Sequence, residues 1–248
     1  MSWPGPGARR LARAGELLRS LAALAAEALA PPVCAGCLAE LDGPGLICPR
    51  CTEALPGDGS SFCYLCGGGL QGGARHVPQS RCFRPGHRDF RARCLYWLHD
   101  PLPAMIHQFK YRGATRLSAP WGAALGELLR GRAELVLPVP LHPAAQSRRG
   151  YNQSALLARA AARAAGLPCV EDALRRTRRT ATQTRLDPRA RRRNLEGAFE
   201  VLRPALVRGR RVALVDDVIT TGATLASAAG ALRAAGAAAL TAVAVARA

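Results

Sequence analysis

The spacing of apolar residues divides the chain into a helical start, a cysteine-rich middle and a long segment in which two periodicities alternate. Over residues 8–30 apolar side chains recur every three or four positions, which predicts a helix. Pro31 and Pro32 end that helix. Residues 1–7 are rich in glycine and proline, and the cysteine-rich stretch has few long apolar runs, so it needs an inorganic staple to fold.

After residue 93 short apolar runs alternate with longer amphipathic segments. The runs predict strands at residues 93–99, 134–139, 198–201, 211–216 and 240–246. The amphipathic segments predict helices at residues 101–110, 117–130, 152–165 and 223–235, with Gly166 as a stop signal. Strands that alternate with helices form a parallel sheet with helices on both faces, so the sequence predicts an α/β fold.

The same pattern predicts three units along the chain. Residues 1–30 form a Gly/Pro-rich start and an amphipathic helix, residues 31–92 a cysteine-rich module, and residues 93–248 the α/β domain. Within the domain, residues 173–194 form a basic, turn-rich segment.

The composition is globular and strongly basic. Hydrophobic residues make up 49% and charged residues 21% of the chain, which excludes a disordered protein. The net charge is +18, from 35 basic and 17 acidic residues, and Lys110 is the only lysine. This balance favours polyanionic partners such as nucleic acid, pyrophosphate or an acidic membrane surface. The alternative is a GC-rich genome, which enriches Ala, Arg, Gly and Pro without selection for charge.

No early segment has the apolar length of a membrane anchor. The run over residues 21–26 is far shorter than the ~20 residues of a membrane-spanning helix. Glu16, Arg19 and Glu27 interrupt the region where a signal peptide needs an unbroken apolar stretch. The sequence therefore predicts a cytoplasmic protein without a transmembrane segment, in which the nine cysteines serve metal rather than disulfides.

Four cysteines have the spacing of a zinc site. Cys34, Cys37, Cys48 and Cys51 read C-x2-C-x10-C-x2-C, and two such knuckles together supply four thiolates in a tetrahedron. A closed shell of four sulfurs leaves no position for water or substrate. The prediction is a structural zinc site rather than free thiols or a redox pair.

A second set of possible metal ligands is incomplete. Cys63 and Cys66 form another C-x2-C pair, and Cys82 is the expected start of its partner knuckle. Three residues after Cys82 stands Pro85, which cannot bind a metal, so His87 is the favoured fourth ligand. Other candidates are His76 and Cys94. The alternative is a degenerate ribbon that is held by packing.

Residues 212–224, VALVDDVITTGAT, predict a strand, a phosphate-binding loop and the start of a helix. Small residues at a helix N-terminus let several backbone N–H groups converge on an anion, and Thr220, Thr221 and Thr224 add hydroxyl donors. Carboxylates at this place suit the 2′ and 3′ hydroxyls of a ribose. Asp216 and Asp217 can both serve only if the strand ends there, because neighbouring strand residues face opposite ways.

This motif resembles the phosphoribosyl pyrophosphate (PRPP) signature of type I phosphoribosyltransferases. Residues 136–158, VLPVPLHPAAQSRRGYNQSALLA, resemble a signature of the ComF family, as do the stretches around Arg176, Gln183 and residues 192–199. QFKYRG at residues 108–113 fits the same family. The order of a cysteine ribbon before a phosphoribosyltransferase domain also matches, and Pro85 is the clear departure.

The resemblance implies roles for particular residues. It implies 5′-phosphate binding by Thr220, Thr221, Gly222, Ala223 and Thr224, and contacts to the ribose hydroxyls by Asp216 and Asp217. It places the pyrophosphate beside Pro140, Leu141, His142, Arg148 and Arg149. Magnesium is expected with the pyrophosphate, held largely by the ligand and water. His142 is a candidate general base by location only, and a structural role is the alternative.

Nine arginines lie between residues 175 and 193, with Asp187 as the one acid among them. The resemblance implies that a loop in this interval closes over the active site. The cluster suits either departing pyrophosphate or the backbone of single-stranded DNA, and the alternative is a solvated basic loop. The candidate residues are Arg176, Arg179, Gln183, Arg189, Arg192 and Arg193.

Three functions compete at this point. The favoured one is a ComF-like protein that binds PRPP with magnesium and serves natural transformation by handling single-stranded DNA, with competence-machinery proteins as partners. The second is an active phosphoribosyltransferase of nucleobase or nucleotide metabolism. Pentosyl transfer is compatible with both of these functions, and we expect the protein to have this activity. The third is a non-catalytic zinc-ribbon adaptor with a regulatory phosphate site.

Overall fold

The computed structural model describes residues 32–55, 61–63, 91–177 and 197–248. The predicted helix over residues 8–30 lies outside them. The strands are β1 (Ser61–Cys63), β2 (Arg91–Trp97), β3 (Leu135–Pro138), β4 (Leu174–Arg176), β5 (Phe199–Val201), β6 (Arg211–Ile219) and β7 (Ala239–Arg247). The helices are α2 (Pro49–Glu53), α3 (Leu102–Tyr111), α4 (Ser118–Leu129), α5 (Pro143–Arg149), α6 (Gln153–Ala165), α8 (Pro204–Val207) and α9 (Ala223–Ala234), with a 3₁₀ turn η2 (Thr115–Leu117).

The main sheet has the order β1-β2-β7-β6-β3. Strands β2, β7, β6 and β3 pair in parallel, as the alternation of strands and helices predicts. The edge strand β1 pairs antiparallel with β2, which the sequence analysis did not expect. Strands β4 and β5 form a separate antiparallel hairpin. The cysteine-rich stretch therefore contributes one strand to the sheet, although the division into three units itself stays a prediction.

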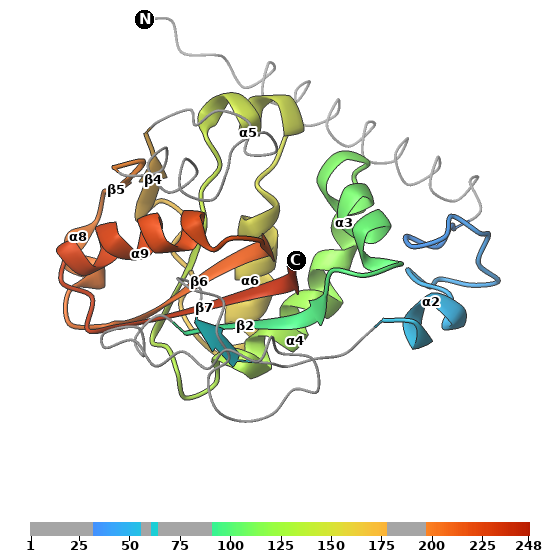
Figure 1. The fold of residues 1–248 in the computed structure, drawn as a ribbon, viewed down its shortest axis with the longest axis horizontal. Helices are drawn as coiled ribbons and strands as arrows, with labels where there is room; N and C mark the ends of the chain where they lie inside the picture. Colours follow the sequence, from blue (N-terminus) through green and yellow to red (C-terminus); the bar gives the residue numbers. More distant parts are fainter. Residues whose placement is uncertain (1–31, 56–60, 64–90, 178–196) are drawn as a thin grey trace, which may run out of the picture.

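Helices cover both faces of the sheet (Figure 1). Helix α9 packs on one face, where Val212 and Leu214 of β6 belong to the same hydrophobic cluster as the apolar side of α9. Helices α3, α4 and α6 cover the other face, and Ala213 and Val215 belong to their cluster. The side chains of β6 thus alternate between two cores, as a strand that is buried on both faces requires.

Helices α4 and α6 lie unusually close because glycine faces alanine between them. A Cβ on Gly122 would lie 2.2 Å from Cβ of Ala160, and one on Gly126 would lie 2.7 Å from the carbonyl oxygen of Ala161. Helix α6 begins at the side-chain cap of Asn152 and ends at Gly166, which is left-handed at φ 68°, so the predicted stop signal is confirmed. This packing fixes the N-terminus of α6 beside β3 and β6.

Strand β6 and helix α5 also differ from the sequence expectation. Strand β6 runs to Ile219 rather than ending near residue 216. No element was predicted for the stretch that forms helix α5, in which His142 is the cap, Pro143 takes the first turn and Gly150 ends the helix with φ 83°. Among the described residues no helix has the length and apolarity needed to cross a membrane.

Candidate ligand site at the carboxyl ends of the strands

The turn from β6 into α9 has the backbone of an anion site. Gly222 caps α9 in the left-handed region, at φ 71°, where a side chain would be strained. The Thr221 hydroxyl oxygen accepts a hydrogen bond from the Ala223 N–H, at 3.4 Å. Within the described residues the N–H groups of Thr220, Thr221 and Gly222 have no acceptor. Free N–H groups at the positive end of a helix attract anions.

This turn forms one wall of a pocket of about 370 Å³. The opposite wall comes from α3 and from Leu98, which directly follows β2. The pocket-lining residues that carry the argument are Lys110, Asp216 and residues 220–224. The structure therefore brings together all five residues expected at the 5′-phosphate and one of the two expected at the ribose.

Asp216 lies on the pocket wall beside the N-terminus of α6. Its Oδ1 accepts hydrogen bonds from the Ser154 hydroxyl and from the Asp217 N–H, both at 2.9 Å. Burial of the carboxyl group raises its pKa to about 7, and the charge of Asp217 acts in the same direction. An acid with this pKa changes charge near neutral pH and accepts hydrogen bonds from hydroxyl groups when ionised.

Asp217 is paired with a lysine of α3. Its Oδ1 lies 3.0 Å from Nζ of Lys110, near the end of α3, and its side chain is only 5% exposed. Its second oxygen, Oδ2, is buried without a hydrogen-bond partner in the described part of the chain. The expectation that the strand ends at the two acids was wrong, because β6 continues to Ile219.

The segment after β3 starts at the same edge of the sheet. The N–H of Val139 donates to the carbonyl of Val215, at 2.9 Å, and the Asn152 side chain donates to the Val139 carbonyl, at 3.2 Å. Pro140 and Leu141 follow directly and are half-buried. Neither lines the pocket.

The charged residues expected at the pyrophosphate belong to α5. Nδ1 of His142 accepts the Ala144 N–H, at 3.2 Å, so this histidine caps the helix. Arg149 stacks over the Tyr111 ring, with Cζ 4.8 Å from its centroid, and bonds to Gln153. Arg148 is exposed. None of the three lines the pocket, and His142 already has a structural hydrogen bond.

Of the residues expected in the basic loop, the structure describes Arg176 alone. It ends β4, and its Cζ lies 5.7 Å from the centroid of Phe199. Burial lowers its pKa, and the charge of Asp216 opposes this shift. The other predicted members lie outside the described residues: Arg179, Gln183, Arg189, Arg192 and Arg193.

Lys110 and Ser154 are site residues that the sequence analysis did not single out. Both lie inside stretches that carried the family resemblance. The sequence spacing does not show that these positions lie near residues 216 and 217, because helix packing brings them together. The one available hint for Lys110 was that no other lysine occurs in the chain.

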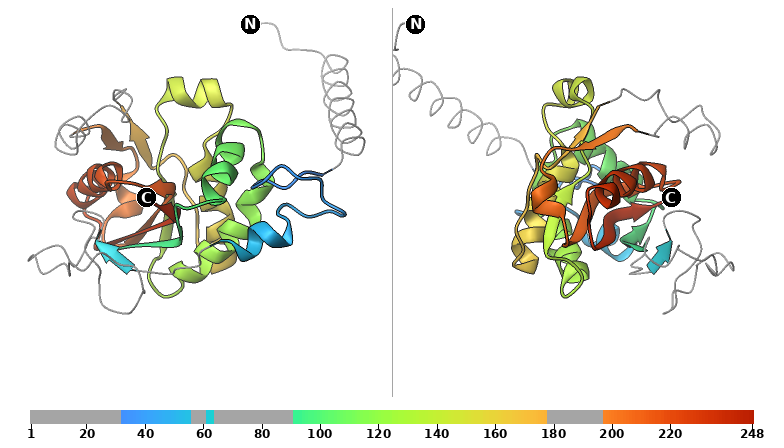
Figure 2. Two further views of the ribbon diagram at one scale, coloured as in Figure 1. Left: turned by 45° about the vertical axis from the view of Figure 1, so that its right-hand side comes forward. Right: turned by 90° about the vertical axis from the view of Figure 1, so that its left-hand side faces the viewer.

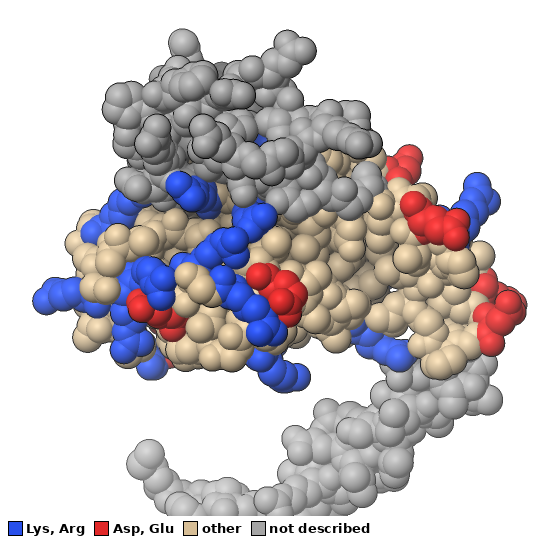
Figure 3. Space-filling view, turned by 90° about the horizontal axis from the view of Figure 1, so that it is seen from below, with Lys and Arg blue, Asp and Glu red and all other residues tan. Residues whose placement is uncertain are grey.

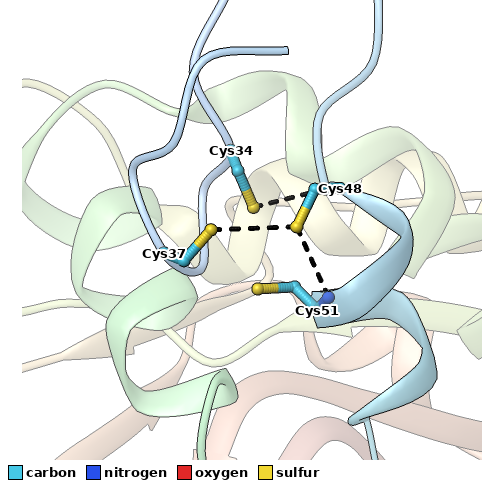
Figure 4. A group of neighbouring side chains, drawn as sticks. All are labelled: Cys34, Cys37, Cys48 and Cys51. Atoms are coloured by element: carbon cyan, nitrogen blue, oxygen red, sulfur yellow. Dashed lines mark hydrogen bonds between the residues drawn. The ribbon is translucent and has the colours of Figure 1, made fainter.

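The four cysteines predicted at a metal site come together. The sulfur atoms of Cys34, Cys37, Cys48 and Cys51 all lie within 4.8 Å of one another (Figure 4). Sγ of Cys37 is 3.7 Å from Sγ of Cys48. Four sulfurs at about 2.3 Å from a zinc ion are roughly 3.8 Å apart in a tetrahedron, so the residues present fit zinc.

Backbone donors hold the thiols in this arrangement. The N–H of Cys48 donates to Sγ of Cys34, at 3.3 Å, and the N–H of Gly36 donates to the same sulfur, at 3.4 Å. Although burial acts against it, these bonds lower the pKa of Cys34 to about 6. A low pKa favours the thiolate, which is the form that binds zinc. Of the second predicted set, the backbone of Cys63 is in β1, and Cys66, Cys82 and His87 lie outside the described residues.

The fold is that of a phosphoribosyltransferase-type α/β domain, and a family model described as "Phosphoribosyl transferase domain" matches residues 152–248. The chain is 36% identical over 202 residues to "DNA utilization protein YhgH" of Escherichia coli (strain K12), covering 78% of this chain and 87% of that protein. It is 31% identical over 191 residues to "Competence protein F" of Haemophilus influenzae, covering 72% and 80%. The chain belongs to this family, the ComF family.

A solved structure, a glutamine phosphoribosylpyrophosphate amidotransferase from B. subtilis, superposes with a TM-score of 0.40 and 21% identity, over 55% of this chain and 30% of that one.

Proposed function

We propose that the pocket binds PRPP. The N–H groups and hydroxyls of residues 220–224 hold the 5′-phosphate, and the acids at residues 216 and 217 serve the ribose. The segment around residues 140–142 lies by the pyrophosphate. The observation that carries this proposal is the left-handed Gly222 at the start of α9, which opens free N–H groups to the same pocket as Asp216.

We further propose pentosyl transfer as the chemistry. The bond between the anomeric carbon and the pyrophosphate oxygen breaks, positive charge builds on the ribose, and an acceptor nucleophile attacks from the opposite face while losing its proton to solvent. The chain contributes by positioning the ribose and by placing negative charge beside it. Magnesium would be held largely by pyrophosphate oxygens and water, and it would supply charge neutralisation to the leaving group.

The biological setting that we propose is the handling of single-stranded DNA in natural transformation, together with competence proteins. The printed names of the relatives support this, since they include "DNA utilization" and "Competence". The arginine-rich interval 175–193 supports it through charge, because phosphate backbones bind clustered arginines. Nucleotide salvage is the alternative, and detectable release of pyrophosphate with a free nucleobase favours it.

Calorimetric titration of the purified protein with PRPP and magnesium tests the first step. The double variant Asp216→Ala, Asp217→Ala is expected to lose measurable affinity while it still unfolds cooperatively. The matched control is Glu171→Ala, Asp172→Ala, which removes an adjacent acidic pair that only forms surface ion pairs with Arg159 and Arg203. Unchanged affinity in the 216/217 variant would contradict the ribose assignment.

A further inference from the structure

Lys110 lies at the pocket wall, where its ammonium can reach a ligand. It lies one residue before the end of α3, its side chain is 21% exposed, and it lines the pocket that also contains the phosphate-type turn. Every other cation among the 35 basic residues is an arginine. Lysine offers a compact ammonium where arginine offers a wide planar fork, so this single exception stands where a ligand has to share space with the cation.

The ammonium of Lys110 has more hydrogen-bond donors than its ion pair with Asp217 uses. A lysine ammonium has three donors, and within the described residues its ion-pair partner is Asp217 alone, at 3.0 Å. Asp217 is 3% exposed and does not line the pocket, whereas Lys110 does. The carboxylate therefore holds the ammonium at the pocket wall, and the other two donors have no partner among the described residues.

The ammonium of Lys110 reduces the negative charge of the two carboxylates beside the pocket. PRPP is a polyanion, and two carboxylates at residues 216 and 217 would repel it. Pairing with Lys110 neutralises one of them, so the pocket presents one carboxylate for hydroxyl groups and positive groups for phosphate. The positive groups lie on both walls: the N-terminus of α9 on one, the ammonium of α3 on the other.

We propose that Lys110 is a ligand-binding residue whose ammonium contacts a phosphate oxygen of the bound phosphoribosyl ligand, and that Asp217 is a positioning residue that acts through Lys110. This deepens the proposed function and rests on it. It also changes one assignment: Asp216 alone meets the ribose hydroxyls.

The test measures the affinity of Lys110→Met for three probes with magnesium: PRPP, ribose 5-phosphate and inorganic pyrophosphate. We expect a loss of roughly 10- to 100-fold, the range for a hydrogen bond to a charged group. A loss shared by ribose 5-phosphate places the contact at the 5′-phosphate, and a loss confined to the other two places it at the pyrophosphate. Both support the proposal, and unchanged affinity for all three overturns it.

The matched control is Arg112→Met, which removes a positive charge two residues away, at an exposed position outside the pocket. It is expected to bind all three probes like the wild type. Lys110→Arg keeps the charge and is expected to recover part of the affinity. If the wild type binds neither PRPP nor ribose 5-phosphate, the proposed function fails first, and this outcome is distinct from equal binding by wild type and Lys110→Met.

A double-mutant cycle separates the role of Asp217 from direct contact. Asp217→Asn is expected to weaken binding in the wild-type background and to have no further effect in the Lys110→Met background, because its action passes through the ammonium. The double variant also leaves no buried carboxylate without a partner, so it keeps the test valid if Lys110→Met folds poorly. An equal loss from Asp217→Asn in both backgrounds would show direct contact with the ligand and overturn the positioning role.

Discussion

The carboxyl group of Asp216 is the titrating centre of the pocket. Its environment combines burial, the neighbouring charge of Asp217 and a hydrogen bond from Ser154, and the net effect raises its pKa from an ordinary 3.8 to about 7. A residue with a raised pKa binds its proton more tightly in the folded state than in the unfolded state. Folding is therefore favoured at low pH, and that advantage is lost as pH rises from about 4 through 7.

We predict that Asp216→Asn increases the stability of the fold and that this increase depends on pH. The wild type bears the cost of ionising a buried carboxyl group above pH 7, up to about 4 kcal/mol, whereas the variant has no charge to bury. We expect Asp216→Asn to raise the thermal midpoint at pH 8 and to change it little at pH 4. Thermal unfolding followed by circular dichroism at both pH values measures this difference.

Ser154→Ala is the companion variant. The Ser154 hydroxyl stabilises the ionised form of Asp216, so its loss is expected to raise the carboxyl pKa above 7, as followed by NMR titration. A stability gain from Asp216→Asn that is equal at pH 4 and pH 8 would contradict the titration assigned to this residue.

At the residue scale, the sequence predicted the chemistry of the pocket better than its geometry. The turn over residues 220–224 was recognisable because its small residues and threonines are consecutive. The strand continues past Asp216 and Asp217 to Ile219, which apolar residues 218 and 219 could have suggested. The contacts of Lys110 and Ser154 were not predictable, since they join residues 107 and 62 positions apart through helix packing.

At the element scale, the four-cysteine segment is packed against the helix that forms the pocket wall. Ala35 shares a buried cluster with Leu102 and Phe109 of α3, and Leu46 and Ile47 pack against the same cluster. A Cβ on Gly36 would lie 3.2 Å from Cβ of Pro101, the residue before α3. Figure 2 shows this segment beside α3 in its left-hand view. We therefore expect metal binding in the segment to stabilise the start of α3.

We predict that the purified protein contains zinc and that its removal destabilises the whole domain. Metal analysis is expected to find one zinc per chain if Cys34, Cys37, Cys48 and Cys51 alone bind it, and two if the second predicted set also does. Stripping the metal with a chelator is expected to lower the thermal midpoint, by about 4–8 °C for a loss of about 2 kcal/mol.

Two sets of cysteine variants serve as controls for the chelator experiment. Cys34→Ser with Cys37→Ser is expected to reproduce the effect of the chelator and to become insensitive to it. Cys169→Ser removes a thiol outside the cluster and is expected to respond to the chelator like the wild type. A protein that contains no metal after purification in zinc-supplemented medium would refute the zinc assignment.

Element order was largely readable from the sequence, because long periodic segments carry their own signal. All five strands and all four helices predicted in the α/β domain appear within three residues of their expected bounds. The edge strand β1 was missed since only three residues form it and their pairing partner, β2, begins 28 residues later in the chain. Helix α5 was missed because its capping residues were interpreted as a pyrophosphate loop.

At the scale of the whole molecule, the basic charge is unevenly distributed. The four-cysteine segment over residues 32–55 has three acids and one arginine, against a net charge of +18 for the chain. In the view from below, basic side chains gather at the left and acidic ones stand out at the right (Figure 3). Arg208 and Arg210 are exposed where β6 begins, at the opposite end of the strand from the pocket. Net charge alone therefore does not specify where a polyanion binds.

Salt dependence separates the effect of general charge from a defined DNA contact. Each phosphate that a protein neutralises on single-stranded DNA adds about 0.7 to the slope of log affinity against log salt concentration. Replacing Arg192 and Arg193 with alanine, in the basic interval, is expected to lower affinity and to flatten this slope by about 1.4. The matched variant Arg208→Ala, Arg210→Ala removes the same charge elsewhere and is expected to leave the slope nearly unchanged. Fluorescence anisotropy with a labelled oligonucleotide at several salt concentrations measures both. Equal flattening by the two variants would assign binding to net charge, and no flattening by either would remove the DNA contact from the interval.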